Sequence, residues 1–158
     1  MNEANVVHKV DYNIHSGIIK GKPREEWKGT YKWARDEGFA HKQAMEIVKG
    51  NLSVDQKGMK RERHRNTNVN QFKPSTQSIW AEKEMRKALK NDDLVALGRG
   101  LHSIQDEVQH GSVFYWFDRH VRGYKRYDPD RFLDESRVEA ETRKYLQRYI
   151  LETNLAQC

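Results

Sequence analysis

The sequence predicts an all-α fold, a compact single-domain helical bundle. Three observations favour this class. Apolar residues recur at spacings of three and four, as they do along one face of a helix. The chain has only three prolines, and it shows no convincing pair of alternating strand segments. Its 158 residues suit one domain, so we assign residues 1–158 to a single helical unit.

The first half of the chain contains two predicted helices. Residues 23–38 open with a proline at a first-turn position and stop at a glycine. Residues 40–50 form a short helix that ends at Gly50. Residues 52–59 add a turn or two, for which Ser53 is the expected cap.

The second half contains three more predicted helices. Residues 76–90 form a helix with serine and threonine at its entry, where these residues are favoured. Residues 92–111 carry the strongest pattern, with Asp92 or Asp93 as cap and a glycine at the end. The last helix covers roughly residues 130–152. The apolar faces of these last two helices are expected to consist of Leu94, Leu97, Leu101, Ile104 and Val108, and of Val138, Tyr145, Leu146, Tyr149 and Ile150.

The remaining segments are polar and the chain is basic. Residues 1–12 are expected to be flexible, and residues 56–76 form a long basic loop of a kind that is usually functional or disordered. The net charge is +6. That charge suits a polyanionic partner, although a basic surface also serves solubility alone. No run resembles a signal peptide or a transmembrane helix, which indicates a soluble chain, or a fragment of a larger secreted or delivered protein.

The stretch LGRGLHSIQDEVQHG places His102, Asp106 and His110 at intervals of four within one predicted helix. Residues four apart lie one turn up and about 40° round the helix, so the three side chains share a face. Adjacent members can hold one metal ion, and the two oxygens of the central carboxylate can bridge two ions. A structural explanation stays open, because a His and an Asp at this spacing often share only a local hydrogen bond. Gly98 and Gly100 predict a close approach by another backbone or by a substrate.

Further candidate ligands precede this helix. His15 lies in YNIHSG, Asp55 follows AMEIVKGNLSV, and His64 lies in KRERHRN. The single cysteine, Cys158, leaves histidines and carboxylates as the metal ligands. With WARDEG between the first two and LGxxLHxxQDxxxHG at the end, this order resembles the zinc-dependent phospholipase C and S1/P1 nuclease superfamily. The resemblance runs from about residue 13 to 150 and is closest to the short C-terminal domains of bacterial polymorphic toxins.

The resemblance implies an all-helical fold with a metal-lined cleft that hydrolyses phosphodiesters. Long members of the superfamily also use an N-terminal tryptophan and a His-x-x-x-Glu pair. This chain begins with Met1 and has no such pair after His120, so we expect one or two ions of Zn²⁺ or another divalent metal. The ligands that the resemblance implies are His15, Asp55, His64, His102, Asp106 and His110.

Two of these carboxylates are candidate catalytic residues. Asp106 is expected to bridge metal ions, and Asp55 to orient or deprotonate the attacking water, unless Asp55 is only a ligand or a helix-terminal acid. A basic run surrounds His64 and aromatic residues follow the metal helix, which suits a phosphate backbone and stacked bases. In the alternative interpretation, the basic run is a solvated loop, and the aromatic residues belong to the core or to a lipid interface. The candidate substrate-binding residues are Lys60, Arg61, Arg63, Arg65 and Trp116.

These features together predict a metal-dependent phosphodiester hydrolase, a nuclease that acts as a bacterial toxin or effector domain with an immunity protein as partner. One alternative is a phospholipase C-type hydrolase of phospholipid. Another is a non-catalytic basic helical domain that binds nucleic acid or a partner protein. His120 and Asp128 are either spare ligands or a surface histidine and a capping acid, while His8 and His41 are assigned to the surface.

Overall fold

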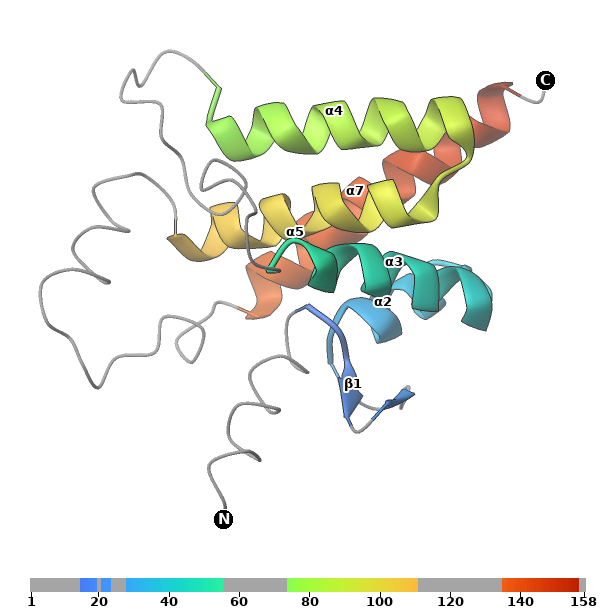
Figure 1. Ribbon diagram of the computed structural model, residues 1–158, viewed down its shortest axis with the longest axis vertical. Coiled ribbons are helices and arrows are strands. Elements are labelled where there is room, and N and C mark those ends of the chain that lie inside the picture. The colour runs from blue at the N-terminus through green and yellow to red at the C-terminus, as the bar shows by residue number, and fades with distance from the viewer. Residues whose placement is uncertain (1–14, 20, 24–27, 56–73, 111–134, 157–158) are drawn as a thin grey trace, which may run out of the picture.

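The all-α prediction is confirmed by the computed structural model. It describes residues 15–19, 21–23, 28–55, 74–110 and 135–156. The helices formed by these residues are α2 (Thr30–Asp36), α3 (His41–Ser53), α4 (Thr76–Asn91), α5 (Leu94–His110) and α7 (Glu135–Ala156). Figure 1 shows α5 at the centre, where it packs against α3, α4 and α7. None of the described helices combines the length and the apolar composition that crossing a membrane requires.

A small antiparallel ladder precedes the helices. Strand β1 (Ile18–Ile19) pairs with β2 (Lys22–Pro23), and the register places Ile18 opposite Pro23. The sequence showed no strand pair because two-residue strands are too short to produce an alternating pattern. The predicted start of the first helix at Pro23 was also wrong, since Pro23 ends β2 and α2 begins at Thr30. The fixed φ of proline suits an edge strand as well as the first turn of a helix.

Helix α3 continues beyond its predicted end. Gly50 lies inside the helix, which ends at Ser53, so the prediction of Gly50 as terminator was wrong. A Cβ atom on Gly50 would lie 1.9 Å from the carbonyl oxygen of Val95 in α5. The glycine is therefore a contact point between two helix backbones. The predicted cap role of Ser53 was wrong too, because its hydroxyl donates to the Gly50 carbonyl 2.7 Å away in the same helix.

The predicted close approach by another backbone is confirmed at Gly98, whereas the atoms that approach Gly100 belong to side chains of α7 and α4. A Cβ atom on Gly98 would lie 1.9 Å from the carbonyl oxygen of Ile47, which belongs to the backbone of α3. A Cβ atom on Gly100 would lie 2.0 Å from the hydroxyl oxygen of Tyr145 in α7. The two glycines thus let α3 and α7 pack closely against α5.

The entries of α4 and α5 follow the predicted capping chemistry. The Ser75 side chain accepts a hydrogen bond from the backbone N–H of Ser78 at 3.0 Å. At the start of α5, Asp93 Oδ1 accepts from the backbone N–H of Ala96 at 3.1 Å. Asp93 is therefore the cap, whereas Asp92 ends α4 in the left-handed conformation with φ 53°.

The predicted apolar faces of α5 and α7 meet in the main core. Leu97 and Leu101 are fully buried there, together with Met85 of α4 and Leu146 of α7. Burial of these side chains is the main source of stability in such a bundle. Because the N-terminal half of α5 is held in this core, the histidine and aspartate one turn further along are held in fixed positions. The other predicted face residues are buried (Leu94, Val138, Tyr145, Tyr149) or partly buried (Ile104, Val108, Ile150).

Candidate metal centre

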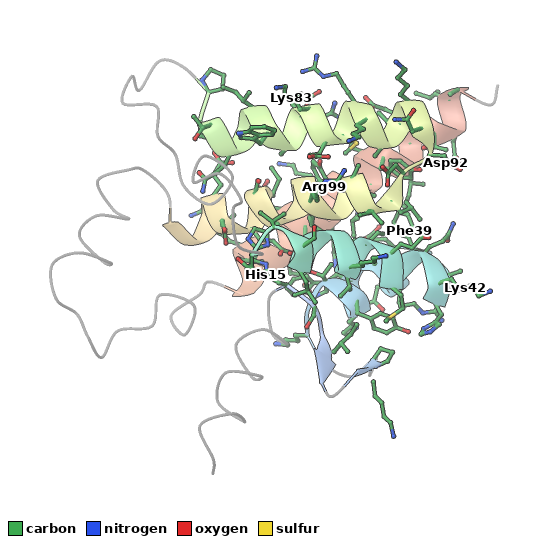
Figure 2. All side chains as sticks on the ribbon, in the orientation of Figure 1. His15, Phe39, Lys42, Lys83, Asp92 and Arg99 are labelled. Carbon is green, nitrogen blue, oxygen red and sulfur yellow. The ribbon has the colours of Figure 1, made fainter. Side chains whose placement is uncertain are left out.

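Three separate segments bring four potential metal ligands together. His15 precedes β1, Asp55 follows the last turn of α3, and His102 and Asp106 lie one turn apart on α5. Ligand atoms of His15, Asp55 and His102 all lie within 4.8 Å of one another. Figure 2 shows the labelled His15 side chain beside the meeting point of α3 and α5.

Asp106 contacts both histidines, one with each carboxylate oxygen. Its Oδ2 lies 3.1 Å from Nε2 of His102, and its Oδ1 lies 3.6 Å from Nε2 of His15. Asp55 approaches from the end of α3, with Oδ1 3.5 Å from Nε2 of His102. Two imidazole nitrogens and two carboxylates therefore converge on one small volume.

The two imidazole rings are stacked. Their centroids lie 4.0 Å apart and their planes differ by 14°. In each ring, Nε2 faces the carboxylates and Nδ1 faces an amide oxygen: Gln105 Oε1 lies 3.0 Å from Nδ1 of His15, and Asn51 Oδ1 lies 2.9 Å from Nδ1 of His102. The stacked pair therefore presents the same edge of both rings to the ligand cluster.

The centre has a buried inner wall and an exposed rim. His102 is 0% exposed and Asp106 5%, whereas the side chain of Asp55 is 52% exposed. A buried carboxylate is costly unless it is paired or coordinates a metal. The burial gradient places Asp106 deep in the centre and leaves Asp55 accessible to solvent.

The environment shifts the pKa values of the two histidines in opposite directions. Burial, aided by the positive charge that His102 can carry, lowers the pKa of His15 to about 4, although Asp106 and Asp55 act against it. Burial also acts to lower the pKa of His102, but the charge and hydrogen bond of Asp106 and the charge of Asp55 outweigh it, and the pKa is raised. His15 is therefore neutral at neutral pH, which is the state in which imidazole binds a metal.

Sequence reasoning identified the four candidate ligands but missed the amides behind them. Asn51 and Gln105 are both 0% exposed. Asn51 follows the buried Ile47 by four residues, so it continues the buried face of α3. A polar residue at a position where the helix period predicts burial is a signal that could have indicated a buried hydrogen-bond network.

Several predicted residues lie outside the described part of the chain. The backbone of His110 forms the last residue of α5, but its side chain is not among those described. His41 is exposed, as predicted, and its Nδ1 lies 2.9 Å from the hydroxyl of Tyr31. The predicted residues that lie wholly outside the described ranges are His8, Lys60, Arg61, Arg63, His64, Arg65, Trp116, His120 and Asp128.

Comparison of the chain with known protein families, with curated proteins and with solved structures finds no match in any of the three. The interpretation of the centre therefore rests on its own geometry and on the sequence motifs.

Proposed function

We propose that this chain is a metal-dependent phosphodiester hydrolase whose metal centre contains His15, Asp55, His102 and Asp106. The observation that carries the proposal is the convergence of the first three residues, from separate segments, to within 4.8 Å of one another. Asp106 adds a second carboxylate, 3.1 Å from His102. Motif resemblance supports the reaction class, and the geometry supports the ligand set.

The donor set suits zinc. Histidine nitrogen and carboxylate oxygen are ordinary zinc ligands, and catalytic zinc sites combine three such ligands with one open position. Both imidazoles direct Nε2 at the cluster, and their Nδ1 atoms are occupied by amide oxygens. When both imidazoles are neutral, as metal binding requires, the two carboxylates leave a charge of −2, which a divalent cation offsets. The raised pKa of His102 means that the ion would displace a proton from that ring.

The residues have separate roles in the proposed reaction. His15, His102 and Asp106 form the buried part of the centre and would hold the ion. When bound, zinc lowers the pKa of a water molecule to near 7, so that hydroxide is supplied at neutral pH. Asp55 is the exposed member, and we assign it the orientation of the attacking water and the acceptance of its proton.

Nucleic acid is the proposed substrate. The support is the basic run Lys60, Arg61, Arg63 and Arg65 beside His64, in a chain of net charge +6. If His64 approaches the centre as the resemblance implies, these cations gather a phosphate backbone next to the metal. Trp116 is proposed to stack on a base. Phospholipid, the second substrate with a phosphodiester bond, is the alternative that the assay distinguishes.

Plasmid DNA and phosphatidylcholine vesicles, each incubated with the zinc-loaded chain, provide the test. We expect nicking of the plasmid without release of phosphocholine. His102→Ala should lower the rate by about 10³-fold, because a metal ion supplies several kcal/mol of stabilisation in the transition state. Ser103→Ala is the matched control, since Ser103 is equally buried and neighbours His102 but contacts no ligand in the described part of the chain. Release of phosphocholine without nicking would assign the alternative substrate. If neither nicked plasmid nor phosphocholine forms, the result contradicts hydrolysis of both substrates.

We also propose that the hydrolase acts as a toxin or effector domain, for which an immunity protein would be the partner. The support is the resemblance to short C-terminal toxin domains. Expression of the unmodified chain in bacteria should therefore stop growth within a few generations, and His102→Ala should restore it. Normal growth with the unmodified chain at equal expression, without a co-expressed inhibitor, would contradict the toxin role and leave the hydrolase proposal to the plasmid assay.

A further inference from the structure

We propose that Asn51 and Gln105 are positioning residues that select the tautomer of the two stacked histidines. Each amide oxygen accepts a hydrogen bond from Nδ1–H, so that in the neutral ring Nε2 is the unprotonated nitrogen and faces the carboxylates. The inference rests on the proposed function, because it assigns these amides to the metal centre. The support is a network of hydrogen bonds among buried side chains.

The amide nitrogen of Asn51 determines what its oxygen does. Nδ2 donates to Gln105 Oε1 at 2.9 Å and to Thr30 Oγ1 at 3.3 Å, which uses both of its hydrogens. The remaining atom, Oδ1, can only accept. It lies 2.9 Å from Nδ1 of His102, so that ring nitrogen must be the donor.

The side-chain amide of Gln105 is oriented in the same way. Its Nε2 donates to Thr30 Oγ1 at 3.0 Å and to Thr142 Oγ1 at 3.1 Å, which again uses both hydrogens. Its Oε1 accepts from Asn51 and lies 3.0 Å from Nδ1 of His15. That nitrogen of His15 is therefore also a donor.

Burial makes the alternative arrangements costly. Asn51, Gln105, Thr30 and Thr142 are all 0% exposed, so water does not replace a hydrogen bond that the network loses. Rotating one amide alone by half a turn would place two oxygens or two NH₂ groups against each other where Asn51 meets Gln105. Rotating either imidazole would replace N–H by C–H at the amide oxygen. In the native arrangement every amide hydrogen and oxygen has a partner.

The result is a pair of rings prepared for a cation. A neutral imidazole that is protonated on Nδ1 carries its lone pair on Nε2. In the neutral rings both lone pairs face oxygens of Asp106, at 3.1 and 3.6 Å, so a positive charge between them is favoured. Without metal, that charge is a proton on Nε2 of His102, and a bound metal ion would take its place. Metal-binding histidines in general donate their other ring nitrogen in this way, which holds the ring and its tautomer.

Nitrogen-15 NMR of the imidazole side chains tests the inference without metal. In the zinc-free chain at alkaline pH, where both rings are neutral, we expect His15 and His102 to be protonated on Nδ1. Protonation of either ring on Nε2 would overturn the assignment for that ring. The measurement does not depend on zinc binding, so correct tautomers in a chain that binds no zinc would contradict the proposed function alone.

Substitutions at Gln105 separate positioning from simple structural support. Gln105→Met removes the acceptor for His15, so the His15 tautomer should become mixed and zinc affinity should fall about 10–100-fold. Gln105→Glu loses both donated hydrogen bonds but keeps an acceptor, so it should retain the Nδ1–H tautomer of His15. Ser103→Ala should leave tautomers and affinity unchanged, since its hydroxyl takes no part in the network.

Two outcomes would overturn the role of Gln105. One is a folded Gln105→Met chain with the original tautomer and zinc affinity. The other is a folded Gln105→Glu chain in which His15 loses its Nδ1–H tautomer, because the effect would then come from the donated bonds to Thr30 and Thr142. If the methionine variant does not fold, the glutamate variant and the spectrum of the unmodified chain still test whether Gln105 selects the tautomer of His15.

Discussion

Replacing Gly98 with alanine is expected to destabilise the chain by about 3 kcal/mol, the upper end of the usual range for overpacked cores. The added Cβ would lie 1.9 Å from the Ile47 carbonyl oxygen and 2.8 Å from the backbone nitrogen of Asn51. Both are backbone atoms of α3, so no side-chain rotation relieves the contact. Helices α3 and α5 would have to move apart, and this movement would displace Asn51 from the metal centre.

Helix propensity alone predicts that this substitution stabilises the chain. Alanine is favoured over glycine within a helix by about 1 kcal/mol, so a loosely packed α5 would be stabilised by Gly98→Ala. Urea unfolding measures the difference. Ala140→Gly is the control for propensity alone, because residue 140 is exposed on α7, and it should cost about 1 kcal/mol. A Gly98→Ala chain more stable than the unmodified protein would contradict the packing of α3 on α5.

The sequence predicts α4 and α5 well because their boundaries carry independent signals, whereas α7, for which no boundary signal was found, ends at Ala156 and not near residue 152. Apolar periodicity and a capping serine at residue 75 together locate α4, and Asp93 locates the start of α5. The earlier helices lack such agreement. Gly50 was assigned as a helix end because glycine is common there, yet its role is contact with the backbone of Val95. A glycine in a single sequence does not distinguish these roles.

The histidines and aspartates of the candidate site could be predicted because their residue types alone indicate metal binding. Histidines and aspartates are the usual ligands of divalent metals, and the i, i+4 spacing of His102 and Asp106 places them on one face of α5. Asn51 and Gln105 were not predictable in the same way, because amides are common throughout proteins. Their role depends on hydrogen bonds among five segments that are brought together only by folding.

Loss of bound metal is the second large effect that we expect, and Asp106→Ala is the substitution that should cause it. Asp106 contacts both histidines, so its removal takes one ligand and the buried negative charge from the centre. In the unmodified chain, zinc at 100 times its dissociation constant should stabilise the fold by about 2.7 kcal/mol. The variant should show no such stabilisation.

Asp93→Ala is the matched control for this substitution. It makes the same change at the other end of α5, where Asp93 Oδ1 caps the helix and contacts no candidate ligand. The loss of a cap costs about 1 kcal/mol, so this variant should be less stable yet bind zinc as the unmodified chain does. The comparison therefore separates ligand loss from general destabilisation.

The most direct test of the metal centre is elemental analysis of the purified chain beside its Asp106→Ala and Asp93→Ala variants. We expect one or two equivalents of zinc, or of another divalent metal, in the unmodified chain and in Asp93→Ala, and a much lower content in Asp106→Ala. Absence of metal from all three chains, even after incubation with zinc, would contradict the account. The cluster of His15, Asp55, His102 and Asp106 would then be a structural hydrogen-bond network.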